Sequence, residues 1–146
     1  MVLKEITLLS EDEYIKYRPL IPNIRNWWWL KSRNPRYDEG VRAVENTGYL
    51  TDIYCHVSYG GVRPFCLFKF ESTDFVFWYK PDKLVGTKIQ CGKYTWTILD
   101  IEGEKVYALC DEIIIDHCFD KFTNVWENSA LKRYLEVEVV NFLTTN

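Results

Sequence analysis

Two adjacent pairs of cysteine and histidine are the residues whose types could do chemistry in this chain. Cys55 precedes His56, and His117 precedes Cys118. Both residue types bind zinc, and a cysteine beside a histidine can act as a nucleophile. Adjacent residues of a strand point to opposite faces, so neither pair can chelate a metal or form a dyad as a unit. The spacing typical of structural zinc is absent as well. We therefore predict no metal, no cofactor and no catalytic residue.

The other charged groups do not indicate an active site. Carboxylates are numerous, but no two stand out by context as an acid and a base. Arg63, in the motif GVRP, is predicted to form an ion pair with a carboxylate or to bind several carbonyl oxygens. We expect a protein that is not an enzyme. The enzyme alternative would use Cys55, His56 or His117, and a thiol that reacts unusually fast at neutral pH would favour it.

Tyrosine and arginine are concentrated in the polar stretch that follows three consecutive tryptophans. Both residue types are enriched where proteins bind proteins. In a strand, Trp27 and Trp29 share one face while Trp28 and Leu30 share the other, so no partner meets all three rings. We expect Trp28 and Leu30 to face the core and Trp27 to reach the surface; an ordinary solvated surface is the alternative for the stretch. The predicted partner-binding residues are Trp27, Arg33, Arg36, Tyr37, Arg42, Tyr49, Tyr54 and Tyr59.

The size and charge of the chain restrict the classes of protein to which it can belong. Its 146 residues fit a single domain, 47% of them are hydrophobic, and the net charge is −3. This mild balance argues against direct binding of nucleic acid or of an anionic membrane. No apolar run approaches the ~20 residues of a membrane span, and the N-terminus lacks a signal-peptide pattern. Five widely spaced cysteines indicate reduced thiols, so we expect a cytoplasmic protein.

Short strands separated by turn signals dominate the pattern along the chain. Turns are predicted at Asn46–Gly48, at Gly60–Gly61 and at 102–104, and strands at 75–80 and in the apolar run EIII. Pro64 should begin its strand, lie at an edge or mark a bulge. The inventory is roughly eight short strands, mainly antiparallel, with two helices, which is an α+β fold.

Capping residues and apolar spacing predict the two helices. Ser10 and Glu13 form a capping box for the first. Pro19 should end it, because the residue before a proline avoids the α region. Asn128 or Ser129 is predicted to cap the second helix, ALKRYLEVEVVNFL, whose apolar residues recur on one face.

Five ordered motifs resemble a bacterial and phage domain family of unknown function. The segments WWLKS (28–32) and GVRP (61–64) are similar to its W-W-L-R-S and G-V-R-P pair. TLLSEDEY (7–14) resembles its L-L-S-x-x-E-Y segment, the stretch 86–113 its opening core, and WENSALKRYLE (126–136) its W-x-N-S-x-L-R-x-W-L helix. The resemblance implies a C-type-lectin-like architecture, related to that of formylglycine-generating enzymes.

The order of the motifs implies a circular permutation. In the family, the core and the W-E-N-S helix come first. Here residues 1–70 resemble the second half of the pattern, 84–143 resemble the first half, and 71–83 connect them. Permutation is tolerated when the chain ends are adjacent and lie at the surface. The idea requires the strand at 65–70 to share a sheet with the strand at 94–99.

The resemblance implies a role in binding. A lectin-like scaffold displays a rigid loop surface, so we expect an intracellular binding module with a protein partner. The family is common in phages and mobile elements, which implies an inhibitor of host defence of the anti-CRISPR kind, acting in the host cytoplasm if it is phage-encoded. The alternative is a small-molecule or nucleotide sensor with a pocket beside Trp27 and Arg63. The E-P-N, Q-P-D and W-N-D triplets of calcium-dependent lectins are missing, and the oligomeric state stays open.

Overall fold

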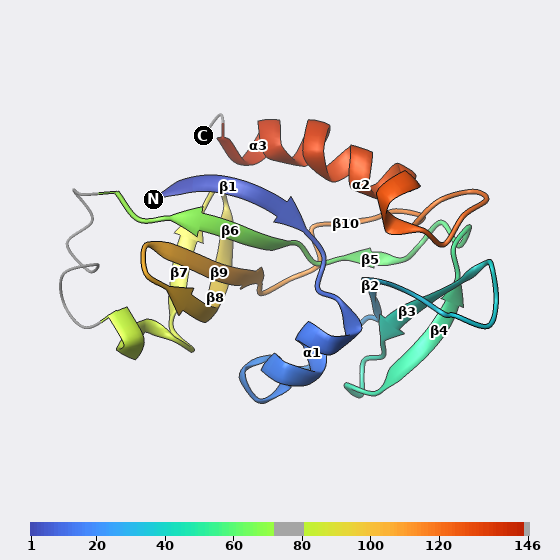
Figure 1. Ribbon diagram of the computed structural model, residues 1–146, viewed down its shortest axis with the longest axis horizontal. Helices are drawn as coiled ribbons and strands as arrows, with labels where there is room; N and C mark the ends of the chain where they lie inside the picture. The colour runs from blue at the N-terminus through green and yellow to red at the C-terminus, as the bar shows by residue number, and fades with distance from the viewer. Residues whose placement is uncertain (72–80, 145–146) are drawn as a thin grey trace.

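Two five-stranded sheets form the framework of the protein, and the computed structural model describes residues 1–71 and 81–144. Within these residues, each sheet contains strands from both parts of the chain (Figure 1). Sheet A has the order β1 (Val2–Thr7), β6 (Phe65–Lys69), β9 (Lys105–Cys110), β8 (Tyr94–Glu102), β7 (Lys88–Cys91). Sheet B has the order β10 (Ile115–Asp116), β5 (Gly61–Val62), β2 (Trp28–Arg33), β3 (Gly40–Val44), β4 (Leu50–Tyr54). The pairing is antiparallel except between β2 and β5, and the predicted α+β class is confirmed.

The first helix, α1 (Glu11–Tyr17), begins at the predicted cap and ends after about two turns before Pro19, as predicted. The Ser10 hydroxyl accepts the backbone N–H of Glu13 at 3.1 Å, and the Glu13 carboxylate accepts that of Ser10 at 2.9 Å. A 3₁₀ turn, Arg18–Leu20, follows directly, and Arg18 keeps α-region angles although Pro19 comes next. The expectation for the residue before the proline was therefore wrong. Pro19 lies in the first turn of a new helical segment, where a missing N–H costs no bond.

The C-terminal helix follows a 3₁₀ turn at Trp126–Asn128 and consists of α2 (Ala130–Tyr134), a π-helical turn (Leu135–Val139) and α3 (Val140–Thr144). Ser129 is its cap, and its hydroxyl accepts the backbone N–H of Lys132 at 3.1 Å. Buried side chains recur every four residues, at Leu131, Leu135, Val139 and Leu143. That interval exceeds the 3.6 residues of an α turn, so the wider π turn helps to keep the four side chains on one face.

The three tryptophans pack on opposite faces of β2, as the geometry of a strand requires. Trp29 lies in the larger apolar cluster, which also receives the C-terminal helix. Trp28 and Leu30 lie in a second cluster with Tyr14 of α1. Both Trp28 and Trp29 are buried, so both faces of β2 are core at this point, whereas Trp27 is half-buried.

Other predicted elements are changed in length or position. Of the run EIII, only Ile115 lies in a strand, the two-residue β10. β6 begins immediately after Pro64, as predicted. A 3₁₀ turn, Pro81–Leu84, precedes β7. The strand predicted at 75–80 and most of the proposed connection lie outside the described residues.

The sheet that contains β6 also contains β8, with β9 between them. This arrangement is the one that the permutation requires, although lectin-like ancestry and the permutation itself stay predictions. Both ends of the described chain lie near the β7–β8 hairpin. At the N-terminal end, the ammonium group lowers the pKa of the Cys91 thiol, although burial raises that pKa more strongly. At the C-terminal end, the side chain of Leu143 lies close to Gly92. In the part of the chain that the structure describes, no helix combines the length and apolarity needed to cross a membrane.

Candidate functional site

An open hollow of about 520 Å³ lies at the margin of sheet B, and we call it the aromatic hollow. Residues from β3, β4 and the loops around them line it. Four of the eight predicted partner-binding residues meet there, and each is aromatic. The lining residues are Trp27, Asn34, Tyr37, Gly40, Asp52, Ile53, Tyr54, Val57 and Tyr59.

The hollow has an apolar base and an exposed rim. Trp27, Ile53 and Val57 are partly buried against the larger core cluster. Tyr54 is 61% exposed, while Tyr37 and Tyr59 are 66% and 67% exposed. Large rings on a fixed base offer contact area at low cost in side-chain entropy, as in antibody binding loops.

Trp29 anchors the base from beneath. Its ring meets that of Trp27 edge-on, with centroids 4.9 Å apart, and Trp27 meets Tyr59 in the same way at 6.2 Å. The Trp29 indole N–H donates to the carbonyl of His117 at 2.8 Å. The backbone of Gly60 lies against the Trp29 ring, and this requires glycine because any Cβ there would overlap the ring. The half-open ring of Trp27 is therefore held in one orientation.

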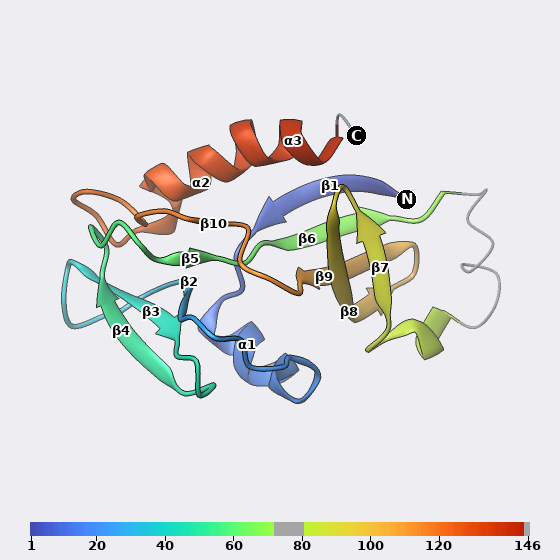
Figure 2. The ribbon, with the colours of Figure 1, turned by 180° about the vertical axis from the view of Figure 1, so that it is seen from behind.

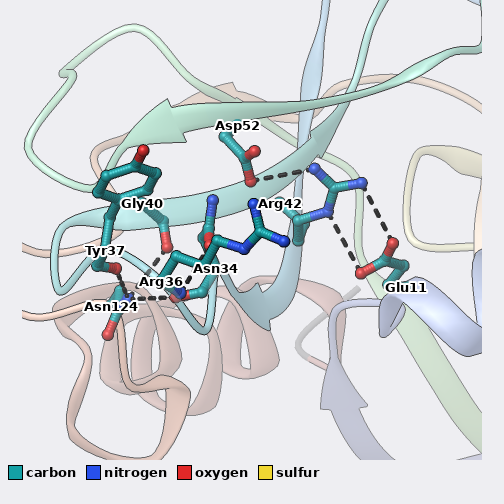
Figure 3. Close-up of polar contacts among 8 residues, drawn as sticks. All are labelled: Glu11, Asn34, Arg36, Tyr37, Gly40, Arg42, Asp52 and Asn124. Atoms are coloured by element: carbon teal, nitrogen blue, oxygen red, sulfur yellow. Dashed lines mark hydrogen bonds and ion pairs between the residues drawn. The ribbon is translucent and has the colours of Figure 1, made fainter.

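A buried asparagine fixes the loop that carries Tyr37. The side-chain amide of Asn124 donates to the carbonyls of Tyr37 at 2.7 Å and Gly40 at 3.1 Å, with a longer bond of 3.4 Å to that of Asn34 (Figure 3). The Arg36 backbone N–H donates to the Asn34 side chain at 2.8 Å. Asn124 is only 4% exposed. Its contribution was not predicted, because nothing near it in the sequence indicates a partner 87 positions away.

Arg42 connects elements of the scaffold and does not line the hollow. Its guanidinium donates twice to the Glu11 carboxylate, at 3.1 and 3.2 Å, and lies 3.1 Å from the Asp52 carboxylate (Figure 3). Partial burial lowers the pKa of Arg42, but these acceptors outweigh it and raise the pKa. The arrangement ties α1 to β3 and β4.

The other predicted residues are on the surface outside the hollow. Arg33 and Arg36 are exposed and are not among the lining residues. Tyr49 is 72% exposed, but it lies in a different depression with Tyr14 and Arg18. The structure therefore brings together four of the predicted aromatic residues and leaves Tyr49 and the arginines apart.

Sequence reasoning missed Phe122, which is 85% exposed. Its loop joins the end of β4, because the N–H groups of Phe119 and Asp120 both donate to the carbonyl of Cys55. The Asp120 carboxylate accepts the N–H groups of Phe122 and Thr123, at 2.9 and 3.1 Å, which fixes the loop.

In each cysteine–histidine pair, the histidine ring packs on a tyrosine and not on its cysteine neighbour. His56 stacks on Tyr54, with centroids 5.7 Å apart, while burial raises the pKa of the neighbouring Cys55 thiol. The His117 ring packs on Tyr134 at 4.7 Å, and its Nδ1 lies 2.6 Å from the Cys118 carbonyl. Across residues 1–71 and 81–144, no three histidine, cysteine or acidic side chains gather in a way that could hold a metal.

Arg63 is buried away from the aromatic hollow. It donates to the carbonyls of Cys110 at 2.7 Å and Pro22 at 3.4 Å, and its guanidinium lies 4.9 Å from the centre of the Trp28 ring. Burial lowers its pKa to about 10, against the opposing effect of Asp111. The prediction of several carbonyl partners is confirmed. Because Trp28 and Trp27 occupy opposite faces, Arg63 and Trp27 do not form the common pocket considered for a sensor.

Comparison of the chain with protein-family models, with curated proteins and with solved structures finds no match. The candidate site is therefore defined by its own geometry.

Proposed function

We propose that this protein is a non-catalytic binding module that holds a partner protein at the aromatic hollow. The supporting observation is the gathering of Trp27, Tyr37, Tyr54 and Tyr59 around one open depression. Tryptophan and tyrosine are the residues that most often dominate binding energy in protein interfaces. Here Trp29 packs against the ring of Trp27, and the bond from Asn124 to the Tyr37 carbonyl fixes the loop of Tyr37 before any partner arrives.

Substitutions in the rim test this proposal. We expect Tyr37→Ala, Tyr54→Ala and Tyr59→Ala each to weaken partner binding by about tenfold or more, the effect of losing one strong aromatic contact. The exposed positions of the three rings should leave the melting temperature nearly unchanged. The measurement is affinity purification from bacterial lysate with quantitative mass spectrometry, followed by titration of the purified partner.

Tyr49→Ala is the matched control, because Tyr49 is equally exposed and lies outside the aromatic hollow. It should retain the partner at the wild-type level. Equal capture by all four variants would remove the aromatic hollow from consideration.

The resemblance to a phage-associated family supports a more specific proposal, in which the partner is a bacterial defence protein. Expression of the protein in a strain protected by CRISPR should then raise phage plaque counts. Expression of Tyr59→Ala should not, since Tyr59 belongs to the rim. Equal plaque counts with and without the wild-type protein would contradict inhibition of that system.

The volume of the aromatic hollow favours a second candidate, a small-molecule or nucleotide sensor. Its 520 Å³ lies within the range of ligand pockets, about 300–1,000 Å³. A ligand seated there would contact Trp27 and change its fluorescence. Titration with nucleotides should then alter the emission of the wild-type protein but not that of Trp27→Phe, and no change in either protein would contradict the sensor.

A further inference from the structure

The outer edge of β4 offers backbone groups beside the aromatic hollow. β4 is the last strand of sheet B, and both views place it on the outside of the sheet (Figures 1 and 2). Its five residues pair with β3 in continuous register, from Gly40 opposite Tyr54 to Val44 opposite Leu50. No bulge interrupts this pairing, so the edge is regular over its whole length, although the Tyr54 carbonyl already accepts the Val57 N–H at 3.1 Å.

The hydrogen bonds to β3 determine which backbone groups point outward. The Cys55 N–H donates to the backbone carbonyl of Glu39 at 2.7 Å, and the Glu45 N–H donates to that of Tyr49 at 2.8 Å. Both bonds join directly opposed residues, so the odd-numbered residues of β4 face β3. The N–H groups of Leu50, Asp52 and Tyr54 therefore face away from β3, at intervals of ~6.8 Å. In the described part of the chain, no hydrogen bond occupies these three donors.

The aromatic hollow reaches this edge. It contacts the consecutive residues Asp52, Ile53 and Tyr54. Side chains of consecutive strand residues point to opposite faces, so the hollow meets the backbone of β4 as well as its side chains. The inner edge of β4 is covered by β3. The hollow is also lined by Gly40 of β3, so it extends from the face of sheet B to its edge strand β4.

The remaining edge strands are less suited to pairing. β1 has an irregularity in its pairing between Leu3 and Glu5, and β10 contains only two residues. β7 has four residues, of which Lys88 and Gln90 are exposed. Bulges, short length and charged side chains are the features that protect sheet edges from added strands. Among the described strands, β4 combines the longest regular free edge with an adjoining hollow.

We propose that the partner of the aromatic hollow is an extended peptide segment that pairs with β4 as a sixth strand of sheet B and places an apolar side chain in the hollow. The inference rests on the proposed binding function and defines its mode. Backbone pairing would supply hydrogen bonds, and the aromatic rings would select the side chain.

Charge argues against a second copy of this chain as the occupant. A symmetric antiparallel pair that uses all three outward residues would set Asp52 directly opposite the Asp52 of the other copy. Like charges in that position destabilise a strand pair. A peptide with a neutral or basic residue opposite Asp52 meets no such repulsion.

A pair of variants at Asp52 separates backbone pairing from side-chain contact. Asp52→Ala and Asp52→Pro both remove the carboxylate beside Arg42, but only the proline removes the outward N–H. Because that N–H does not bond to β3, the proline leaves the bonds between β3 and β4 in place, and proline is tolerated on edge strands. The probe is a peptide selected from a displayed library of random 12-residue sequences on the full chain and labelled for fluorescence anisotropy.

We expect Asp52→Pro to bind the peptide at least tenfold more weakly than Asp52→Ala, which lacks the same carboxylate but keeps the N–H. In the wild-type complex, amide hydrogen exchange should slow at Leu50, Asp52 and Tyr54 and change little at Thr51 and Ile53, which already face β3. The exchange measurement decides the matter if Asp52→Pro fails to fold.

Equal affinity of the two variants together with unchanged exchange at the outward amides overturns the strand-pairing mode, as does a library that gives no binding peptide. The Tyr59→Ala variant tests the proposed function separately. Weaker peptide binding by Tyr59→Ala with unaffected Asp52→Pro would keep the aromatic hollow as the binding site and discard the added strand.

Discussion

At the scale of single residues, burial decides which reactive side chains can act. Cys55, Cys66 and Cys110 are buried. Desolvation raises the pKa of each thiol, to about 11 for Cys110. The thiolate is the reactive form, so a raised pKa and a closed environment both slow its chemistry.

We therefore expect these three thiols to react with iodoacetamide at pH 7.5 far more slowly in the native protein than in urea. Mass spectrometry of the labelled peptides measures the rate at each position, and the same cysteines in the unfolded chain are the internal reference. Rapid labelling of native Cys55 would contradict this prediction and favour the enzyme alternative.

At the scale of the element, the loop that carries Phe122 depends on one carboxylate. Asp120 accepts the N–H groups of Phe122 and Thr123 and also that of Ala130, at the start of α2. Burial raises the pKa of Asp120, but the three backbone donors outweigh it and lower the pKa below its usual value. The bonded, ionised carboxylate therefore stabilises the folded state.

The sign of the pH dependence follows from this lowered pKa. The stabilisation is present above the unfolded pKa, near 4, and is lost as pH falls through the lower folded value. Asp120→Asn should lower the free energy of unfolding by about 1–3 kcal/mol at pH 6. Urea titrations should show a smaller difference between variant and wild type at pH 3. Asp116→Asn, on exposed β10, is the control and should show little effect at either pH.

At the scale of the whole molecule, both sheets draw strands from the two parts of the chain. β6 belongs to the first part and lies between β1 and β9, while β10 of the second part pairs with β5. Neither part completes a sheet alone. The two ends of the described chain both lie near the β7–β8 hairpin.

A permutant tests this organisation. We expect a chain with residues 1 and 146 joined by a short glycine–serine linker, and opened between β6 and the turn Pro81–Leu84, to keep the circular dichroism of the wild type. Its melting temperature should fall by less than about 8 °C, equivalent to ~2–3 kcal/mol. A permutant opened inside the central strand β9 is the control and should not fold. Loss of structure in both chains would contradict the closeness of the ends.

Local chemistry allowed several features to be predicted from the sequence. The Ser10–Glu13 capping box needs only residues three positions apart. The opposite faces of Trp28 and Trp29 follow from the two-residue period of a strand, and β6 begins after Pro64 because proline lacks the donor that a ladder needs. These features depend on neighbours in the chain, so the sequence alone determined them.

The aromatic hollow was decided only by the tertiary structure. Tyrosine enrichment indicated a binding stretch, but it could not separate Tyr49 from Tyr59. The loop of Tyr37 depends on Asn124, 87 residues away, and Trp29 bonds to His117, 88 residues away. Contacts across such separations form only when the sheets assemble, and no local pattern encodes them. The same assembly leaves β4 at the margin of sheet B, beside the rings that surround the hollow.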